Sequence, residues 1–171
     1  MTMAQHNKAQ SKLGLINEAS RADIDRWIAK YPPERKRSAV MGALRVVQDQ
    51  NKGYLTNELM DAVAEYLDLP PIAVYEVATF YSMYELEAVG KHKICVCTNI
   101  SCMLRGSDEV VAHLNKRLGI GLGETTNDGR FTLKEVECLG ACVDAPMFQI
   151  ADQYHGKLTP ETIDAILDGL E

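Results

Sequence analysis

Cysteines are the side chains of this sequence with the clearest capacity for chemistry. Four of the five fall into two pairs, Cys97 with Cys102 and Cys138 with Cys142, and a long segment separates the pairs. Sets of four thiolates bind either a tetrahedral zinc ion or an iron–sulfur cluster. The pattern therefore predicts one metal centre on these four residues, without choosing the metal.

Other cysteine chemistry fits this spacing less well. The redox chemistry of thioredoxins uses C-x-x-C, and neither pair has two intervening residues. The fifth cysteine, Cys95, stands two residues before Cys97 and would share a strand face with it. A buried thiol commonly packs as a small hydrophobe, so we expect Cys95 to be a core residue and not a fifth ligand.

Two predicted strands position the cysteine pairs. Residues 93–97 and 131–136 are short, apolar or alternating segments, and each is followed closely by one cysteine pair. Residues 108–118 between them have helical periodicity, which gives a strand–helix–strand unit. Loops beyond the carboxyl ends of two such strands lie at one end of the sheet, so we expect the four thiolates to converge there.

The segment after the second cysteine pair completes a small α/β arrangement. Residues 147–151 and 155–158 are predicted as strands around a turn at 152–154, and Thr159 is placed to cap a last helix. Strand, helix, strand, strand, helix is an order like that of thioredoxin. The fold class expected for this part is α+β or α/β.

The first half of the chain predicts helices. Ser20 is placed to cap a helix that ends before Pro32, and three further helices follow, one of them after Thr56. Trp27 and Tyr81 are expected in the core of this small bundle. We therefore expect a flexible N-terminal segment over 1–19, a helical bundle over 20–88 and the thioredoxin-like domain over 89–171.

Composition limits the class of protein. The chain has 171 residues, 46% of them hydrophobic, and a formal net charge of -6, which disfavours nucleic-acid binding. It has no apolar run of the roughly 18 residues that a membrane span needs, and its first 15 residues lack the apolar middle of a signal peptide. We expect a cytoplasmic protein that does not insert into the membrane.

The residues around the predicted centre suggest its properties. Apolar or small side chains in the cysteine loops favour a shielded site; they are Met103, Leu104, Leu139, Ala141, Val143, Pro146 and Met147. Asp144, Glu135 and Glu137 add negative charge, which predicts a low reduction potential.

Other apparent motifs do not indicate an active site. The glycines of 119–123 follow a predicted helix and lack the preceding strand of a dinucleotide loop, so we interpret them as a helix stop. The histidines at 6, 92, 113 and 155 show no paired spacing. The sequence therefore favours an electron carrier within a larger enzyme.

Three segments together resemble a known family. They are Cys97-Thr-Asn-Ile-Ser-Cys102, Glu137-Cys-Leu-Gly-Ala-Cys-Val-Asp-Ala-Pro-Met147 and Glu76-Val-Ala-Thr-Phe-Tyr-Ser-Met83. The family is that of the thioredoxin-like [2Fe-2S] subunits of respiratory complex I, the NADH-quinone oxidoreductase. The resemblance runs from about residue 20 to the C-terminus.

This resemblance implies a function. It places the ligands of one [2Fe-2S] cluster on Cys97, Cys102, Cys138 and Cys142, and so favours iron over zinc. It implies partners, an FMN- and NADH-binding subunit and an adjoining iron–sulfur subunit, with the helical segment serving docking. The chain would be a non-catalytic electron-transfer subunit in the peripheral arm of a proton-translocating complex attached to the inner membrane.

Two alternatives remain open. The equivalent subunit of an NAD-reducing hydrogenase or an NAD-dependent formate dehydrogenase shares the flavin module, and sequence separates these poorly from complex I. A structural zinc protein that acts as an interaction module is the alternative outside the redox class.

Overall fold

The computed structural model describes residues 11–170. They form two compact units that divide between Ala88 and Val89. Within the described range, no helix combines the length and the apolar character needed to cross a membrane.

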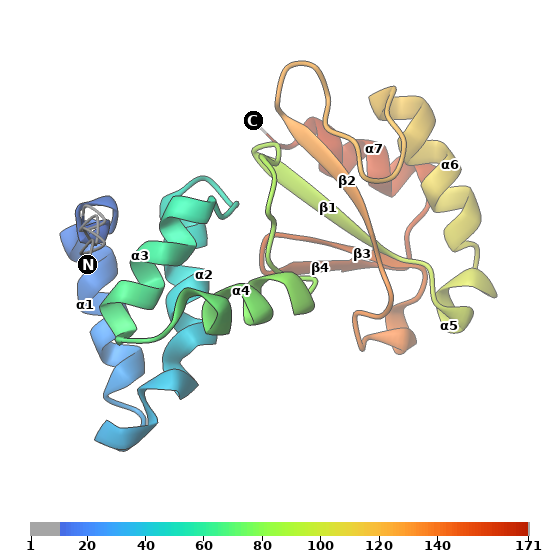
Figure 1. Ribbon diagram of the computed structural model, residues 1–171. Helices are drawn as coiled ribbons and strands as arrows, with labels where there is room; N and C mark the ends of the chain where they lie inside the picture. The colour runs from blue at the N-terminus through green and yellow to red at the C-terminus, as the bar shows by residue number, and fades with distance from the viewer. Residues whose placement is uncertain (1–10, 171) are drawn as a thin grey trace, which may run out of the picture. The chain divides into compact units, whose positions relative to one another are not determined.

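The N-terminal unit is built from helices (Figure 1). The four α-helices are α1 Glu18–Ile28, α2 Val40–Gln50, α3 Asn57–Leu67 and α4 Pro71–Phe80. Short 3-10 helices at Leu13–Leu15 and Pro33–Ala39 accompany them. Thr56 caps α3 by accepting a hydrogen bond from the backbone N–H of Leu59, as its position before the helical pattern predicts.

The start of α1 differs from the prediction. Asn17 is the N-cap, because its side-chain oxygen accepts a hydrogen bond of 2.8 Å from the N–H of Ser20, so Ser20 lies inside the first turn and is buried. Asn and Ser cap helices about equally well, and sequence preference alone does not separate them. The cap at Asn17 leaves Ile16 before the helix, only 1% exposed in the core.

The expectation of a flexible segment over 1–19 does not fit its described part. Ser11 donates a hydrogen bond of 2.7 Å to Glu65, and Lys12 forms an ion pair of 2.6 Å with Asp61 on α3. Burial of Ile16 also holds this stretch on the bundle. Residues 1–10, the rest of that expectation, lie outside the described residues.

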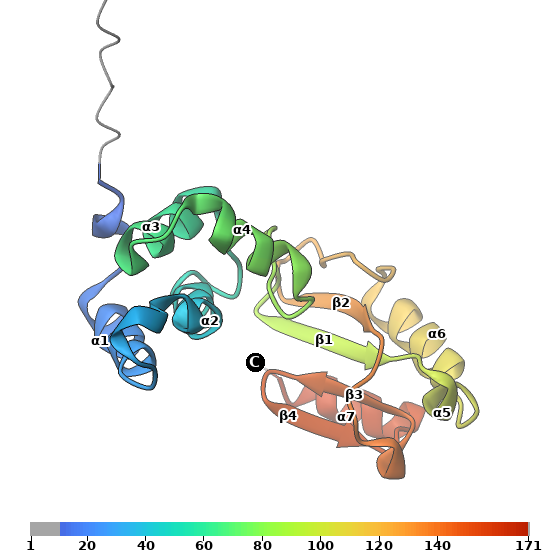
Figure 2. The same cartoon turned by 60° about the horizontal axis from the view of Figure 1, so that its bottom comes forward.

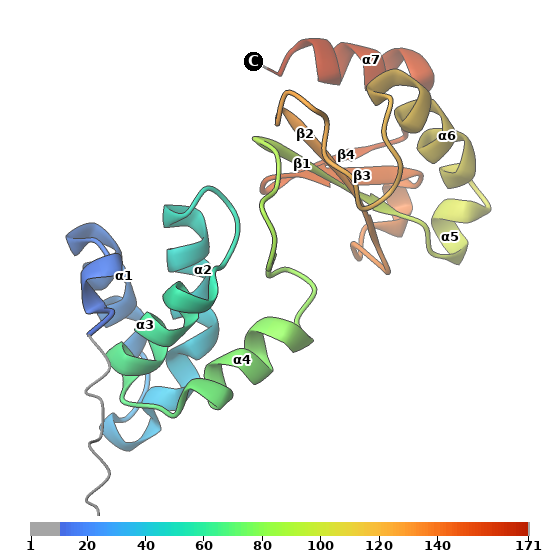
Figure 3. The ribbon, with the colours of Figure 1, turned by 45° about the horizontal axis from the view of Figure 1, so that its top comes forward.

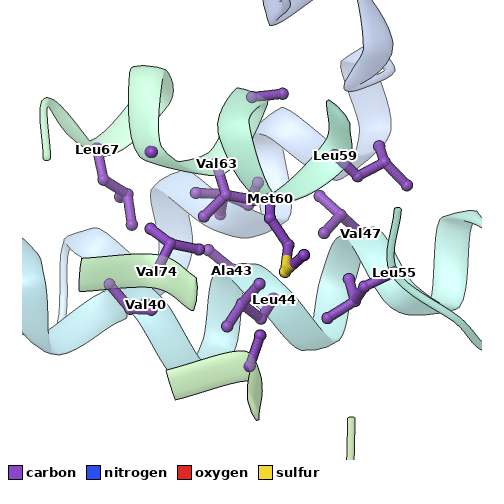
Figure 4. Packing of buried hydrophobic residues seen from close by; sticks show 14 of the residues in the cluster. Val40, Ala43, Leu44, Val47, Leu55, Leu59, Met60, Val63, Leu67 and Val74 are labelled. Atoms are coloured by element: carbon purple, nitrogen blue, oxygen red, sulfur yellow. The ribbon is translucent and has the colours of Figure 1, made fainter. Parts of the chain in front are cut away.

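The core of the helical unit contains side chains from all four α-helices, and Figure 4 shows those that α2, α3 and α4 contribute. Leu44, Val63 and Val74 are fully buried in it. Trp27 is partly buried against this core, whereas Tyr81, also expected there, is 40% exposed. The reason is that α4 ends at Phe80 and Tyr81 has extended backbone angles, so helical spacing no longer places Tyr81 on the face of Val74.

The C-terminal unit contains a four-stranded sheet in the order β2-β1-β3-β4 (Figure 2). The strands are β1 His92–Cys97, β2 Phe131–Val136, β3 Met147–Ile150 and β4 Gln153–Gly156. β1 and β2 are parallel, and the other two pairs are antiparallel. The β3–β4 turn falls at residues 151–152, earlier than predicted, with Ala151 at a φ of 51°.

Two helices cover one face of this sheet, α6 Ser107–Leu118 and α7 Pro160–Asp168 (Figure 3). Leu114 of α6 and Ile163 of α7 are fully buried against Val96 and Phe148 of the sheet. Thr159 caps α7, as its position predicts, and does so through a capping box. The arrangement confirms the α+β class expected from the sequence.

Candidate metal centre

The parallel pairing of β1 and β2 brings the two cysteine loops to the same end of the sheet, beyond the carboxyl ends of both strands. Cys97, the last residue of β1, lies opposite Val136, the last residue of β2. Both chains therefore leave the sheet side by side, and Cys138 follows two residues after Val136. This confirms the strand placement on which the predicted convergence depended.

Short helices that were not predicted shape both loops. The helix α5, Ile100–Met103, carries Cys102, and a 3-10 helix at Cys142–Asp144 begins with Cys142. Elements of three or four residues are too short to give a periodic pattern, which is why the sequence did not reveal them.

Cys97 and Cys102 lie together and buried. They are 3% and 1% exposed, and they pack with Ala145, Met147 and the loop residue Leu139. Burial raises the pKa of the Cys102 thiol to about 11, and the adjoining Cys97 adds to the rise. The Cys102 thiol is therefore neutral at neutral pH, and a metal that binds here must displace its proton.

Cys138 and Cys142 are exposed on the second loop. The Sγ of Cys138 accepts a hydrogen bond of 3.3 Å from the N–H of Gly140, whose φ of 72° gives the turn its shape. Cys142 lies near enough to Cys102 to contribute to its raised pKa. Among residues 11–170, no three potential ligand side chains are grouped closely enough to hold a metal ion. The expected convergence of the four thiols is therefore only partial. Cys97 and Cys102 are in contact and Cys142 is near them, whereas Cys138 is hydrogen-bonded within its own loop.

The shielding expected from the loop residues is only partial. Leu139, Ala141, Pro146 and Met147 are buried or pack around Cys97 and Cys102, but Met103, Leu104 and Val143 are 46%, 77% and 78% exposed. Apolar residue types favour burial, but they do not determine which side of a short loop faces the solvent.

Cys95 is not a core residue, contrary to the prediction. It is half-buried, and its neighbours across the ladders are Lys134 and Gln149. The alternation of β1 directs Ile94 and Val96 toward α6 and α7, so Cys95 lies on the opposite face. No disulfide joins Cys95 or any of the other four cysteines, all of which lie in the described range.

The other residues considered from sequence have structural partners. His113 contacts Asp164 at 2.9 Å, and Gly119 ends α6 in the left-handed conformation expected of a helix stop. Asp144 forms an ion pair of 3.5 Å with Lys157. His6 lies outside the described residues.

Two residues near the cysteines were missed by the sequence reasoning. Asn99 caps α5 and also contacts the second cysteine loop, and the hydroxyl of Tyr154 on β4 donates a hydrogen bond of 3.0 Å to the carbonyl of Leu139. An Asn three residues before Cys102 is a recognisable cap signal, but nothing in the sequence marks Tyr154.

The donor set identifies the kinds of metal that fit. Four soft thiolate donors, two of them among buried apolar side chains, suit zinc or an iron–sulfur cluster equally. Residues 24–171 match the family described as thioredoxin-like [2Fe-2S] ferredoxin. The chain belongs to this family. Membership of this family therefore favours an iron–sulfur cluster over zinc.

Similar proteins are named as one subunit of NADH-quinone oxidoreductase, the one lettered E. The protein of this name from Rickettsia bellii (strain RML369-C) is 50% identical over 143 residues, which cover 84% of this chain and 86% of that protein. The corresponding protein of Rhizobium meliloti (strain 1021) is 45% identical over 148 residues, 86% of each chain.

Solved structures share the fold. A crystal structure of NAD+-reducing [NiFe]-hydrogenase in the air-oxidized state matches with a TM-score of 0.64 and 21% identity. The match covers 74% of this chain and 22% of the hydrogenase chain. At this identity the likeness concerns the fold alone.

Proposed function

We propose that this chain is the electron-transfer subunit of an NADH-quinone oxidoreductase, and that Cys97, Cys102, Cys138 and Cys142 hold its [2Fe-2S] cluster. The observation that carries the proposal is the parallel register of β1 and β2, because both cysteine-bearing loops then start at the same end of the sheet. The half-identical relatives named as a subunit of that oxidoreductase support it.

The chain supplies a site that is buried on one side and open on the other. Cys97 and Cys102 offer two ligands away from water, while Cys138 and Cys142 offer two on an exposed loop. Cys102 and Cys142 lie near each other on different loops, so a cluster held by all four residues would join the two loops. When bound, a [2Fe-2S] cluster takes up and returns one electron.

We assign NADH and FMN to a partner subunit, and infer that an adjoining iron–sulfur subunit lies in the same complex. This makes the chain non-catalytic, part of the peripheral arm of a proton-translocating complex attached to the inner membrane. The name shared by its relatives, a subunit of an enzyme that oxidises NADH, supports this division of labour.

The equivalent subunit of an NAD-reducing hydrogenase or formate dehydrogenase is the second candidate. The NAD+-reducing hydrogenase shares the fold of this chain at 21% identity, whereas the relative named as a subunit of the quinone enzyme is 50% identical. Isolation of the native complex decides between them. NADH-dependent quinone reduction supports the first candidate, and hydrogen or formate oxidation coupled to NAD+ reduction supports the second.

Purification of the full chain tests the cluster. We expect a brown protein with roughly equal iron and acid-labile sulfide, and an EPR signal after dithionite reduction. Replacing any one proposed ligand with Ser, for example Cys102→Ser, should lose or weaken the cluster. Cys95→Ala is the matched control and should keep it.

Two results would count against the proposal. A colourless protein that contains zinc would indicate a structural metal site. Equal cluster loss in Cys95→Ala and in the four ligand variants would show that the ligand set is wrong.

A further inference from the structure

We propose that Asn99 is the positioning residue that fixes the two cysteine loops relative to each other and adjusts the electrostatics at Cys97. This inference rests on the proposed function, because it assumes that the four cysteines hold one centre. It concerns a side chain that is not itself a ligand.

Asn99 uses both ends of its amide. Its Oδ1 accepts a hydrogen bond of 2.8 Å from the N–H of Ile100, which caps the helix that carries Cys102. Its Nδ2 donates a hydrogen bond of 2.7 Å to the carbonyl oxygen of Glu137, the residue immediately before Cys138. One side chain therefore joins the first cysteine loop to the second, across 38 positions of sequence.

The acceptor of this bond also faces a ligand sulfur. The Sγ of Cys97 lies 4.0 Å from the carbonyl oxygen of Glu137 and donates to it as a thiol. The carbonyl oxygen is the negative end of a dipole beside this sulfur. The amide of Asn99 donates to the same oxygen and so offsets that negative end.

A neighbouring bond shows why Asn99 differs from an ordinary loop contact. Thr98 donates a hydrogen bond of 2.6 Å to the carboxylate of Glu135, which ties the ends of β1 and β2 together. Glu135 lies on β2 and Thr98 is the first residue after β1, so this bond lies at the strand ends. Asn99 acts beyond the strand ends, where the ladder no longer fixes the distance between the loops.

Asn99→Ser removes the hydrogen bond to Glu137 while it keeps a residue that can cap α5. Ser is as good an N-cap as Asn and carries no charge, but its side chain is too short to cap Ile100 and also reach Glu137. The matched control is Asn51→Ser. Asn51 donates a hydrogen bond of 3.0 Å from Nδ2 to the carbonyl of Tyr54, so the same chemistry is removed in the helical unit.

Three measurements on the full chain test the inference. In Asn99→Ser we expect iron release to a chelator to be several-fold faster, the reduced EPR signal to broaden, and the midpoint potential to become more negative. A ten-fold fall in the ratio of reduced to oxidised centre would correspond to 59 mV for this one-electron couple. Asn51→Ser should match the wild type in all three measurements.

An unchanged midpoint and an unchanged release rate in Asn99→Ser would overturn the inference, even with a lower melting temperature. If Asn99→Ser does not fold, Asn99→Thr, another cap former, takes its place; failure of both with Asn51→Ser folded would show a general structural role and also overturn it. If the wild type holds zinc in place of iron, the proposed function is wrong. The role of the Asn99–Glu137 hydrogen bond can still be tested, because zinc release from Asn99→Ser can be compared with zinc release from the wild type.

Discussion

The hydroxyl of Tyr154 on β4 donates a hydrogen bond of 3.0 Å to the carbonyl oxygen of Leu139, the residue after Cys138. This bond holds the exposed cysteine loop to the edge strand of the sheet. Leu139 in turn packs against the buried pair Cys97 and Cys102. A residue that binds no metal therefore restrains the loop that presents two of the proposed ligands.

Removal of this hydroxyl should loosen the loop without unfolding the protein. In Tyr154→Phe we expect several-fold faster iron release to a chelator, and a loss of at most about 1 kcal/mol in the free energy of unfolding. Tyr66→Phe is the control, because Tyr66 donates a similar bond of 2.9 Å to Asp25 in the helical unit. Equal release rates in both variants would contradict a role for Tyr154 in the loop.

Gly42 should not tolerate the smallest side chain. A Cβ at this position would lie 2.3 Å from the Trp27 ring, so the ring must shift. We expect Gly42→Ala to lower the free energy of unfolding by about 1–3 kcal/mol, as overpacking does. This reverses the usual gain of about 1 kcal/mol from Ala over Gly within a helix.

Urea unfolding followed by tryptophan fluorescence measures this effect, since Trp27 is the one tryptophan in the sequence. The native emission should also shift in Gly42→Ala. At Gly14, where no atom lies within 4 Å of an added Cβ, Ala should cost much less. A Gly42→Ala variant as stable as the wild type would show that Trp27 moves away freely.

Tyr84 should make stability depend on alkaline pH. It is 5% exposed, its hydroxyl donates a hydrogen bond of 2.8 Å to the carbonyl of Met41, and burial raises its pKa to about 12. An unfolded tyrosine ionises near a pKa of about 10. The unfolded state thus loses its proton first, so the contribution of Tyr84 is complete below pH 10 and is lost as pH rises toward 12.

Tyr84→Phe tests this dependence. At pH 7 the variant should be less stable by about 1 kcal/mol, the typical net value of a hydrogen bond. Between pH 10 and 12 the wild type should lose more stability than the variant, so that the difference shrinks. Parallel curves of unfolding free energy against pH for the two proteins would contradict the burial argument.

Asp144 and Lys157 should shift the midpoint potential in opposite directions. The two form an ion pair of 3.5 Å just beyond Cys142. Since reduction adds an electron, Asp144→Asn should raise the midpoint and Lys157→Gln should lower it. Redox titration at low and high salt measures both shifts, which screening should reduce. An unchanged or lowered midpoint in Asp144→Asn would show that the charge of Asp144 does not hold the potential down.

Local patterns were sufficient to predict the four strands and the six longer helices of the described residues, but not the short helices in the cysteine loops. The bounds of β2 agree with the sequence prediction, and Thr56 and Thr159 cap the helices that follow them. The α1 cap was wrong by three residues, because Asn17 and Ser20 are equally good caps by residue type. In the structure Asn17 caps the helix, and Ser20 lies buried in its first turn. The ligand set remains a prediction of sequence and family resemblance.

The sequence by itself determined the four strands and the six longer helices of the described residues, the two cysteine pairs and their place after two strands. Periodicity and residue type encode these features within a few neighbouring positions. Only the tertiary structure decided that Cys95 faces away from α6 and α7, that Asn99 reaches Glu137 and that Tyr154 holds Leu139. These contacts depend on strand register and on loops that meet in space, and no local pattern records either.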